Sequence, residues 1–360
     1  MRVLVAMSGG VDSSVAAALL RDAGHDVTGC TMRLWGGASD TGCCSVADVD
    51  DARRVAQQLD IPHYVFDFGD EFTAGVVDPY VDAHARGRTP NPCIECNRTV
   101  KFDRLMRRAD VLGFDAVATG HHARVEERSG RWHLRRAVDH AKDQSYVLHM
   151  LGQARLARTL LPIGELTKDD VRAHAVALGL RTAAKPDSQD VCFITKGGRA
   201  AFLSTRLDLT PAPIVDTAGN AVGAVDAVQL VTVGQRRGLG LAGAAGPRYV
   251  VDVDAERVVV GTRDDLLVDQ VELESIAWVD GPVEGEVLVQ SSAHGGVVPA
   301  RLAGSTVRFD RPVVRVASGQ SVVLYRGDEV LGGGIATERF IPPGSAGGRR
   351  RPAAPRGGWG

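Results

Sequence analysis

Residues 8–14 read SGGVDSS, a run of small and hydroxyl-bearing residues that is suited to binding an anion. A Gly-Gly turn lets backbone N–H groups approach a ligand closely, and the serines add hydroxyl donors. Where such a turn opens a helix, the helix N-terminus carries about half a positive charge. No Lys-Ser or Lys-Thr pair follows the glycines, so the segment does not have the Walker pattern. The residues predict a phosphate site at this turn.

The chain has six cysteines, and three of them stand where thiol chemistry is plausible. Cys93 and Cys96 form a C-x-x-C pair, and Cys192 lies about a hundred residues later. No second C-x-x-C and no Cys/His pair follows at zinc-finger spacing. The three thiols suit a nucleophile with a sulfur carrier, and they also suit three ligands to an iron–sulfur cluster. Cys43 and Cys44 are given no catalytic role.

Cys93 and Cys96 lie in a basic, proline-containing segment. Residues 86–108 contain seven Lys or Arg and two acidic residues, a local surplus that the net charge of −2 for the whole chain hides. Basic clusters of this kind bind phosphodiester backbones with salt-dependent affinity. A solvated helix face would account for the charges, but it would need neither the prolines nor the cysteines. We therefore expect this segment to contact a nucleic acid.

The surrounding pattern predicts the elements that position these groups. Buried parallel strands are expected at residues 2–6, 25–32, 63–67 and 116–120. Helices are expected at residues 15–24, 46–59 and 102–112, with a further helical stretch from 145 to about 180. Alternating strands and helices are typical of a doubly wound parallel sheet, which binds ligands at the carboxyl ends of its strands. Met32, Gly120 and His121 all lie at or just past such ends.

At 360 residues the chain is too long for a single hydrophobic core. After about residue 200 the pattern changes to short β-branched runs separated by Gly, Asp and Asn, which suggest small β-domains or barrels. We divide the chain into an α/β catalytic domain at 1–200, a central β-rich domain at 201–275, a C-terminal β-barrel at 276–343 and a disordered basic tail at 344–360.

Composition and hydropathy indicate where the protein works. No apolar run approaches the ~20 residues of a membrane span. The chain begins directly with a predicted core strand and has no pattern of a secretory leader. These features predict a cytoplasmic protein with no membrane partner, in a compartment where structural disulfides are rare.

Residues 8–14 resemble the pyrophosphate loop of the ATP-pyrophosphatase superfamily, whose members cleave ATP between its α- and β-phosphates. The chain up to about residue 340 resembles the bacterial tRNA-specific 2-thiouridylases, which thiolate the wobble uridine of certain tRNAs. Besides the loop, the matching segments are residues 87–92 (GRTPNP), 118–121 (ATGH), 142–146 (KDQSY), 192–194 (CFI), 234–240 (GQRRGLG) and 331–335 (LGGGI). The resemblance implies a Rossmann-like ATPase domain, then a small central β-rich domain that contacts tRNA, then a β-barrel.

The resemblance also implies a two-step reaction that uses ATP and Mg²⁺. ATP adenylates the uracil O2, and pyrophosphate leaves into the loop, where N–H groups and hydroxyls stabilise its charge. A sulfur carried as a persulfide on Cys192 is then transferred to C2, and AMP leaves. Cys96 is implied as the nucleophile that releases sulfide from Cys192 or closes a disulfide with it. A sulfur-relay protein or a cysteine desulfurase is implied as the sulfur donor.

The same matching assigns the other site residues. ATP binding is implied for Ala6, Met7, Ser8, Gly9, Gly10, Val11, Asp12, Ser13, Met32 and Gly120. Contacts with tRNA or with its target base are implied for Asn91, Pro92, Cys93, His121, Lys142, Asp143, Gln144 and Gln320.

Two places depart from the family pattern. Cys93 stands where many members have an aspartate proposed as a general acid/base, and a thiol has an unperturbed pKa of ~8.5 against ~3.9 for that carboxyl. The change creates the C-x-x-C, so an alternative is that Cys93, Cys96 and Cys192 hold an Fe–S cluster that carries sulfide. Ser292 and Ala293 stand where the family often has an Arg-Tyr pair against tRNA, and that contact lacks its usual side chains here.

Two further functions stay open. A synthetase of the same superfamily would adenylate a small molecule and would need neither the paired cysteines nor the basic segment. A tRNA-binding module without catalysis would be expected to have a damaged loop at residues 8–14, and that loop is intact. Pyrophosphate release that depends on unmodified tRNA would distinguish these alternatives.

Overall fold

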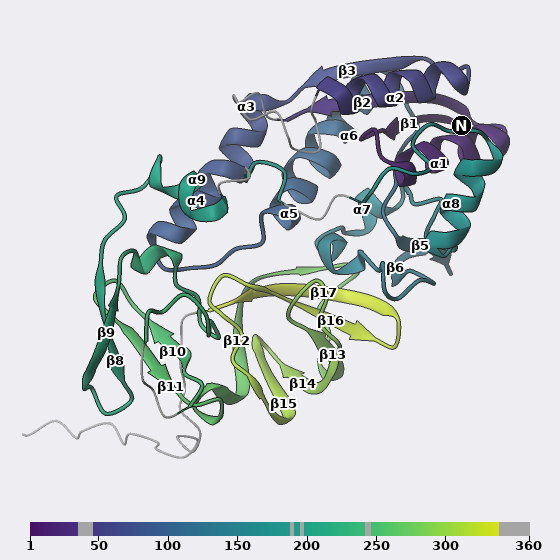
Figure 1. Cartoon of the computed structure of the whole chain (residues 1–360). Helices are drawn as coiled ribbons and strands as arrows, with labels where there is room; N and C mark the ends of the chain where they lie inside the picture. The colour runs from purple at the N-terminus through teal and green to yellow at the C-terminus, as the bar shows by residue number, and fades with distance from the viewer. Residues whose placement is uncertain (35–45, 188–190, 195–197, 242–245, 338–360) are drawn as a thin grey trace, which may run out of the picture.

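A computed structural model of the chain describes residues 1–34, 46–187, 191–194, 198–241 and 246–337. Figure 1 shows a parallel sheet with its helices in the upper part of the molecule and two β-structures below it. The predicted order of an α/β domain, a central β-rich domain and a C-terminal barrel is confirmed. Among the described residues, no helix has the length and apolar character needed to cross a bilayer. Cys43, Cys44 and the tail from 344 lie outside the described residues.

The parallel sheet is built from β1 (Arg2–Ala6), β2 (Asp26–Arg33), β3 (His63–Asp67), β4 (Ala116–Thr119) and β7 (Thr159–Leu160). Its strand order is β3-β2-β1-β4-β7, and every neighbouring pair is parallel. The chain moves outward from β1 in one direction to β3 and then returns to β4 on the other side of β1. The order therefore reverses between β1 and β4, and such a switch point leaves a crevice at the carboxyl ends of the strands.

The sheet is covered on both faces, as its β-branched strands predict. Val3 and Val5 pack into one hydrophobic cluster with α1 (Val11–Asp22), α2 (Val46–Gln58) and α8 (Lys168–Ala177). Leu4 and Ala6, which alternate with them along β1, pack into the other cluster. Successive side chains of a strand point to opposite faces, so one apolar run serves two cores.

The second cluster is covered by a series of shorter helices, two of which, η1 and η2, have the wider π-helical turn. They are α3 (Gly69–Phe72), η1 (Thr73–Val77), α4 (Asp78–Ala85), α5 (Pro92–Glu95), η2 (Cys96–Arg104), α6 (Leu105–Val111), η3 (Ser145–Leu148), α7 (Gln153–Leu156) and α9 (Gly198–Ser204). The basic helix predicted at 102–112 is thus the end of η2 followed by α6.

The continuous helical stretch predicted from residue 145 to about 180 was wrong. That region consists of η3, α7, the short strand β7 and α8. Gly152 precedes α7, and Pro162 follows β7, where a proline cannot continue a helix. β7 pairs with β4 and adds the outermost parallel strand, so sheet pairing prevails over local helix preference there.

The central domain is a small sheet. Its strands are β8 (Ala212–Asp216), β9 (Ala221–Val225), β10 (Tyr249–Val253) and β11 (Val258–Gly261), in the order β10-β11-β8-β9, and the short helix η4 (Val228–Leu230) packs beside it. The C-terminal barrel contains β12 (Leu267–Trp278), β13 (Gly285–Gln290), β14 (Val298–Ala303), β15 (Thr306–Val314), β16 (Ser321–Arg326) and β17 (Glu329–Ala336). Pairing of β12 with β17 closes it. β12 runs through residue 275, where the sequence pattern places a domain boundary.

The catalytic domain and the barrel share one continuous sheet. The hairpin β5 (Ala123–Arg128) and β6 (Arg131–Arg136) follows β4, and β6 pairs with β17 of the barrel. Asp328, in the turn before β17, accepts hydrogen bonds from Arg124 and Arg135 at 2.6 Å each. These pairings fix the barrel against the domain that holds the phosphate loop.

Candidate active site

The loop between β1 and α1 presents an uncapped helix N-terminus at the switch point. Gly10, the residue before α1, has no side chain to bond the N–H groups of the first turn. Ser14 Oγ and Ser13 Oγ both donate to Gly10 O, at 2.8 and 3.2 Å. Ser8 N donates to Ser13 Oγ at 3.1 Å, which ties the loop to the helix. N–H groups at the start of a helix of this length fit a phosphate, as the sequence predicts.

The backbone of this loop contacts α2 and Lys185. Gly9 has φ +71°, and a Cβ there would lie 2.3 Å from the carbonyl oxygen of Asp48. Lys185 Nζ donates to Gly9 O at 3.0 Å and contacts carboxylate oxygens of Asp48 at 2.6 Å and Asp51 at 2.8 Å. Burial lowers the pKa of Lys185, but its hydrogen bonds and charge interactions with the two aspartates outweigh this effect and raise the pKa. The ammonium is therefore charged and joins the loop to α2.

A second lysine lies beside the loop. Lys168 Nζ, at the start of α8, contacts both oxygens of Asp12 at 2.7 and 2.8 Å, and His122 Nε2 lies 3.3 Å from Asp12 Oδ1. Burial raises the pKa of Asp12, but the hydrogen bonds from His122 and Lys168 lower it more, so the carboxyl is ionised. The side chain of Lys168 is 10% exposed. The site thus combines N–H donors with a buried lysine whose charge is shared between the carboxylates of Asp12 and Asp187.

Asp187 links Lys168 to the segment that carries Cys192. Its carboxylate contacts Lys168 at 2.8 Å, Lys142 at 2.9 Å and Arg172 at 3.0 Å. Burial raises the pKa of Asp187, but Lys168 and Lys142 lower it more strongly, to about 2. Asp187 and Lys185 belong to the same short segment and each contacts the surroundings of the phosphate loop. The beginning of the Cys192 segment is therefore fixed to the loop by ion pairs.

The end of β4 closes the other side of the crevice. Gly120 packs against the first turn of α1 so closely that a Cβ would lie 2.5 Å from Ser13 N. The next residue, His121, is buried, and its Nδ1 lies 2.7 Å from Thr119 Oγ1. Burial, with Lys101 and His122 adding to it, holds the pKa of His121 well below its usual value, so the ring is neutral. Only glycine fits at 120.

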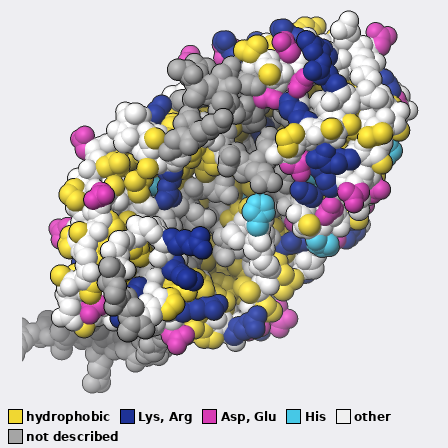
Figure 2. Space-filling model, viewed as in Figure 1, with side chains coloured by type: hydrophobic (Ala, Val, Ile, Leu, Met, Phe, Trp, Pro, Cys, Tyr) yellow, Lys and Arg dark blue, Asp and Glu magenta, His cyan; other side chains and the backbone are white. Residues whose placement is uncertain are grey.

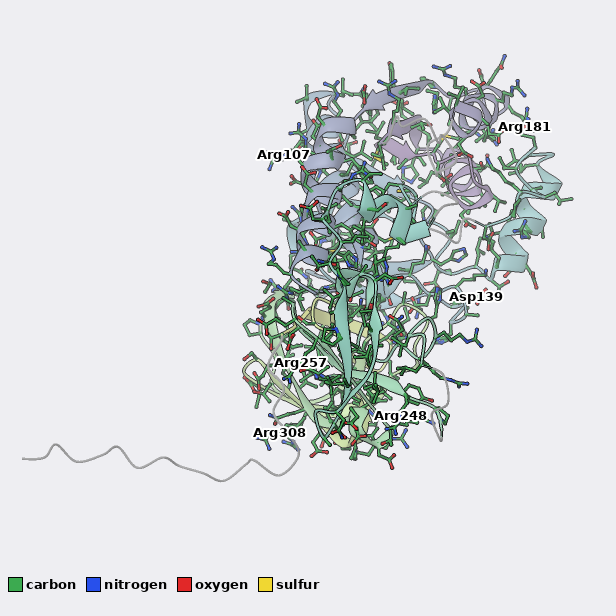
Figure 3. The ribbon with its side chains drawn as sticks, turned by 60° about the vertical axis from the view of Figure 1, so that its left-hand side comes forward. Arg107, Asp139, Arg181, Arg248, Arg257 and Arg308 are labelled. Carbon is green, nitrogen blue, oxygen red and sulfur yellow. The ribbon has the colours of Figure 1, made fainter. Side chains whose placement is uncertain are left out.

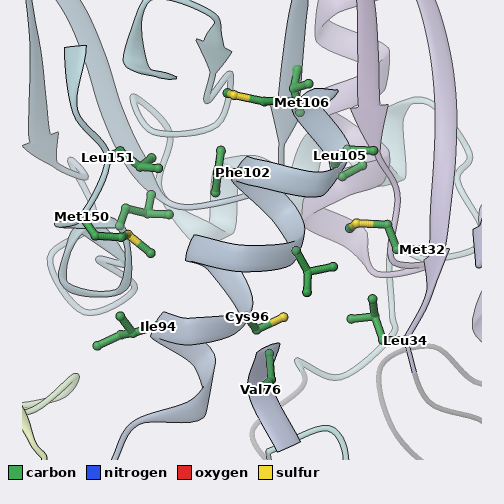
Figure 4. Close-up of a cluster of buried hydrophobic side chains, with 14 of the residues drawn as sticks. Met32, Leu34, Val76, Ile94, Cys96, Phe102, Leu105, Met106, Met150 and Leu151 are labelled. Carbon is green, nitrogen blue, oxygen red and sulfur yellow. The ribbon is translucent and has the colours of Figure 1, made fainter. Parts of the chain in front are cut away.

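Two of the three predicted cysteines border one hydrophobic cluster. Cys96 begins η2, is 7% exposed and packs among residues that include Met32 and Leu34 (Figure 4). Cys192 is partly buried and packs against the same cluster. Cys93 is exposed, on α5, where its N–H donates to the Asn91 side chain at 3.0 Å. The structure thus places Cys96 and Cys192 at the same hydrophobic cluster and leaves Cys93 at the surface.

The alternative of an Fe–S cluster held by Cys93, Cys96 and Cys192 is not borne out. In the described part of the chain, which includes Cys93, Cys96 and Cys192, no three His, Cys, Asp or Glu side chains converge as ligands for a metal. The reason is local: Cys93 is exposed on α5, whereas Cys96 is buried in the hydrophobic cluster. The donor set does not fit an iron–sulfur cluster, and no reaction step is derived through one. Cys30 is fully buried in β2, and burial raises the pKa of its thiol.

Residues 142–144, predicted to contact tRNA, have internal partners. Asp143 is 4% exposed at its side chain and accepts hydrogen bonds from Ser145 N and Oγ at 3.1 and 2.9 Å. Gln144 Oε1 accepts the N–H of His122 at 2.9 Å, and Lys142 pairs with Asp187. These side chains join the hairpin region to the phosphate site, and contact with tRNA stays a prediction for them.

Sequence analysis missed four residues that the structure places around the loop, namely Lys168, Lys185, His122 and Asp187. Their partners lie 110 to 176 residues away for His122, Lys168 and Lys185, so no local spacing connects them to residues 8–14. One signal was present for Lys168, which follows the capping residue Thr167 at the start of a helix with Asp170 at the third position. It predicts the helix but not what its lysine contacts.

Family models match the chain in three consecutive parts. Residues 1–196 match the tRNA methyl transferase HUP domain, residues 200–262 the tRNA methyl transferase PRC-barrel domain, and residues 268–336 the aminomethyltransferase beta-barrel domain. The last match begins close to the first residue of β12.

Curated relatives match the chain along nearly its whole length. Proteins named tRNA-specific 2-thiouridylase MnmA are 48% identical in Mycobacteroides abscessus (94% of this chain, 99% of the relative), Chloroflexus aurantiacus (92% and 97%) and Mycolicibacterium smegmatis (94% and 100%). A solved 4-thiouridine synthetase–RNA complex with bound ATP matches 53% of this chain and 44% of its own at 17% identity, with a TM-score of 0.38. On the strength of the curated relatives, the chain belongs to the tRNA-specific 2-thiouridylase family.

Proposed function

We propose that this chain is an ATP-dependent tRNA uridine 2-sulfurtransferase that releases pyrophosphate and AMP. The observation that carries the proposal is the loop at residues 8–14, which lies at the switch point with an uncapped helix N-terminus and a buried lysine beside it. In a chain of this family, such a loop supports activation of a tRNA uridine by ATP. The chain would act in the cytoplasm, where its RNA substrate is found.

In the first step, the uracil O2 attacks the α-phosphorus of ATP and the bond to the β-phosphate side breaks. The N–H groups at the start of α1 and the Lys168 ammonium would stabilise the negative charge that develops on pyrophosphate. The carboxylate of Asp12 is a hard oxygen donor at this loop and fits the ligand preference of Mg²⁺; on binding Mg²⁺ it would give up its contacts with Lys168, whose ammonium would then be left to the pyrophosphate. When bound, Mg²⁺ would neutralise phosphate charge and orient the leaving group.

In the second step, sulfur replaces the activated oxygen at C2. The Cys96 thiolate attacks the inner sulfur of a Cys192 persulfide, which forms a Cys96–Cys192 disulfide and releases hydrosulfide. Hydrosulfide adds to C2, and AMP leaves with the former O2. A dithiol reductant then restores both thiols. Support comes from the shared hydrophobic cluster that Cys96 and Cys192 border, since it would keep water from a reactive sulfur species.

The tRNA would bind across the catalytic domain and the β domains. Figure 2 shows Lys and Arg side chains gathered in two areas of one face, over the lower middle and at the upper right. Asn91, Pro92 and Cys93 are proposed to face the target base, and His121 with Lys142 to lie near the bound RNA. A sulfur-relay protein or cysteine desulfurase is proposed to load Cys192.

The test is a pyrophosphate-release assay with purified protein, ATP and tRNA transcripts that lack modification. The proposal expects release only when an unmodified tRNA with a wobble uridine is present, and a transcript with cytidine at that position is the matched control. Release that depends on a small molecule instead would favour a synthetase. Binding of tRNA with no release under any condition would contradict catalysis.

A further inference from the structure

A turn of the barrel holds the segment that leads to the proposed base-facing residues. We name residues 318–320 the barrel turn and residues 87–92 the target loop. The N–H of Thr89 donates to Ser318 O at 2.9 Å, and the Gln320 side-chain amide donates to Thr89 O. Both backbone polar groups of Thr89 are therefore bonded to the barrel turn, one to a backbone carbonyl and the other to a side-chain amide.

The barrel turn is itself anchored to the end of β17. Gly319 N donates to Ala336 O at 3.0 Å, and Ala336 N donates back to Gln320 O at 2.9 Å. β17 pairs with β12, β16 and β6, so the turn belongs to the most connected part of the barrel. The position of Thr89 is thus defined by a rigid sheet rather than by its own loop.

Close packing at Gly319 makes this contact specific. Gly319 has φ +86°, and a Cβ there would lie 3.0 Å from Thr89 N and 3.1 Å from Arg88 Cβ. A Cβ at 319 would therefore push the target loop away from the barrel turn by a few tenths of an ångström. Position 319 favours glycine because its φ is positive and because it lies against the backbone of Thr89.

Two further contacts hold the target loop. Arg88 forms an ion pair with Glu274 of β12, so the charge of Arg88 is paired within the protein. Thr89 Oγ1 lies 3.4 Å from Thr232 Oγ1, just beyond η4 in the central region. The target loop is therefore contacted from both β domains, although it belongs to the catalytic domain.

The target loop leads directly into the helices that carry Cys93 and Cys96. Asn91, two residues after Thr89, accepts the N–H of Cys93 and so begins α5, and Cys96 directly follows α5 as the first residue of η2. Asn91 is two residues from Thr89, at most about 7 Å along the chain, so the contact with the barrel turn lies directly before the start of α5.

We infer that the barrel turn is a positioning element of the active site, which sets the target loop against the activated base. The inference rests on the proposed function and deepens it. In this role the barrel contributes to the rate of the reaction and not only to the affinity for RNA, because a displacement of about 1 Å near reacting groups lowers a rate by up to about a hundredfold.

The test compares Gly319→Ala with Gly304→Ala in the full-length chain. Gly304 also lies in a barrel turn with positive φ (+59°), but a Cβ there would meet no atom within 4 Å. Both variants suffer the same type of backbone strain, and only the first disturbs the target loop. Each is measured for tRNA dissociation constant, for kcat and KM of tRNA-dependent pyrophosphate release, and for amide hydrogen exchange of a peptide that covers residues 86–95.

For Gly319→Ala we expect kcat to fall about three- to tenfold, the tRNA dissociation constant to stay within about twofold, and exchange of the peptide to accelerate. Gly304→Ala should match the unmodified chain in all three. A raised dissociation constant with unchanged kcat would overturn the inference and leave the barrel as an RNA-binding surface. If the unmodified chain releases no pyrophosphate, the proposed function fails, and hydrogen exchange still decides whether the barrel turn holds the target loop.

Discussion

Replacing Lys185 by methionine removes one ammonium and keeps most of the side-chain volume. The ammonium contacts Gly9 O, Asp48 and Asp51, so its loss deprives the phosphate loop of a hydrogen bond and leaves two neighbouring carboxylates without their cation. We expect two separate effects, a loss of stability and a weaker use of ATP. The second effect is the one that bears on function, because Gly9 lies in the loop that would receive pyrophosphate.

The size of the stability effect follows from the exposure of the three side chains. Hydrogen bonds to charged groups contribute about 1.5–3 kcal/mol each when buried. Here Lys185 is 29% exposed, and Asp48 and Asp51 are 16% and 20% exposed, so solvent screens part of the interaction. We take about 2–3 kcal/mol for the whole set, which corresponds to a fall in Tm of a few °C for a cooperative unit that includes the catalytic domain and the barrel.

The matched control is Arg181→Met. Arg181 Nε lies 2.9 Å from the same Asp51, but its side chain is 47% exposed and Figure 3 shows it at the outer edge of the catalytic domain. An exposed pair of this kind contributes less than about 1 kcal/mol. The assay is tRNA-dependent pyrophosphate release at varied ATP, together with thermal unfolding of each variant. For Lys185→Met we expect kcat/KM for ATP to fall about 10–100-fold, and for Arg181→Met a change of less than about twofold.

Two results would refute this reasoning. Equal losses of Tm in the two variants would mean that Lys185 acts as an ordinary surface ion pair. A lower Tm for Lys185→Met with unchanged kcat/KM for ATP would mean that α2 alone positions the loop. In that case Lys185 would stabilise the domain without positioning its active site.

Three other predictions follow from residues already described. Cys192→Ser should abolish thiolation of tRNA and leave tRNA-dependent pyrophosphate release within about twofold of wild type; loss of both would contradict the persulfide role. Gly9→Ala, whose Cβ would meet Asp48, should abolish ATP-dependent activity, whereas Gly24→Ala, with positive φ but open space, should cost only about 1–2 kcal/mol in denaturant unfolding. Burial lowers the pKa of His149 to about 4 from 6.5, so the unfolded chain binds a proton that the folded chain does not, and stability should fall as pH drops from 6.5 to 4. His149→Gln should flatten that pH dependence in urea titrations by up to about 3 kcal/mol, and an unchanged slope would contradict it.

The elements of the catalytic domain were predictable where a local rule determines them. The strands at 2–6 and 63–67 and the helix at 46–58 were found because β-branched runs and helical spacing are local signals. β7 was missed because a two-residue strand has no periodicity, and only its pairing with β4 defines it. Register and closure of the barrel also depend on pairings between distant strands, such as β12 with β17.

Part of the candidate site was also predictable from local residues, and part of it was not. The loop at 8–14 was predicted from its residues, and its uncapped helix is what the glycines imply. Lys168 and Lys185 were not predicted as site residues. Their carboxylate partners lie more than a hundred residues away in the sequence, and no local pattern indicates such a pair. The cysteine pair was read as a possible ligand set from spacing alone, and the structure separates Cys93 from Cys96 by burial.

The pairing of β6 with β17 has a consequence for how the molecule unfolds. The family match changes near residue 268, but the two parts are not structurally separate there. The hairpin of β5 and β6 in the catalytic domain extends the sheet of the barrel, since β6 pairs with β17. Catalytic domain and barrel should therefore melt as one cooperative unit rather than in separate transitions. A chain shortened to its first two family regions would expose the edge of β6 to pairing with other molecules, so aggregation rather than a smaller enzyme is the expected product.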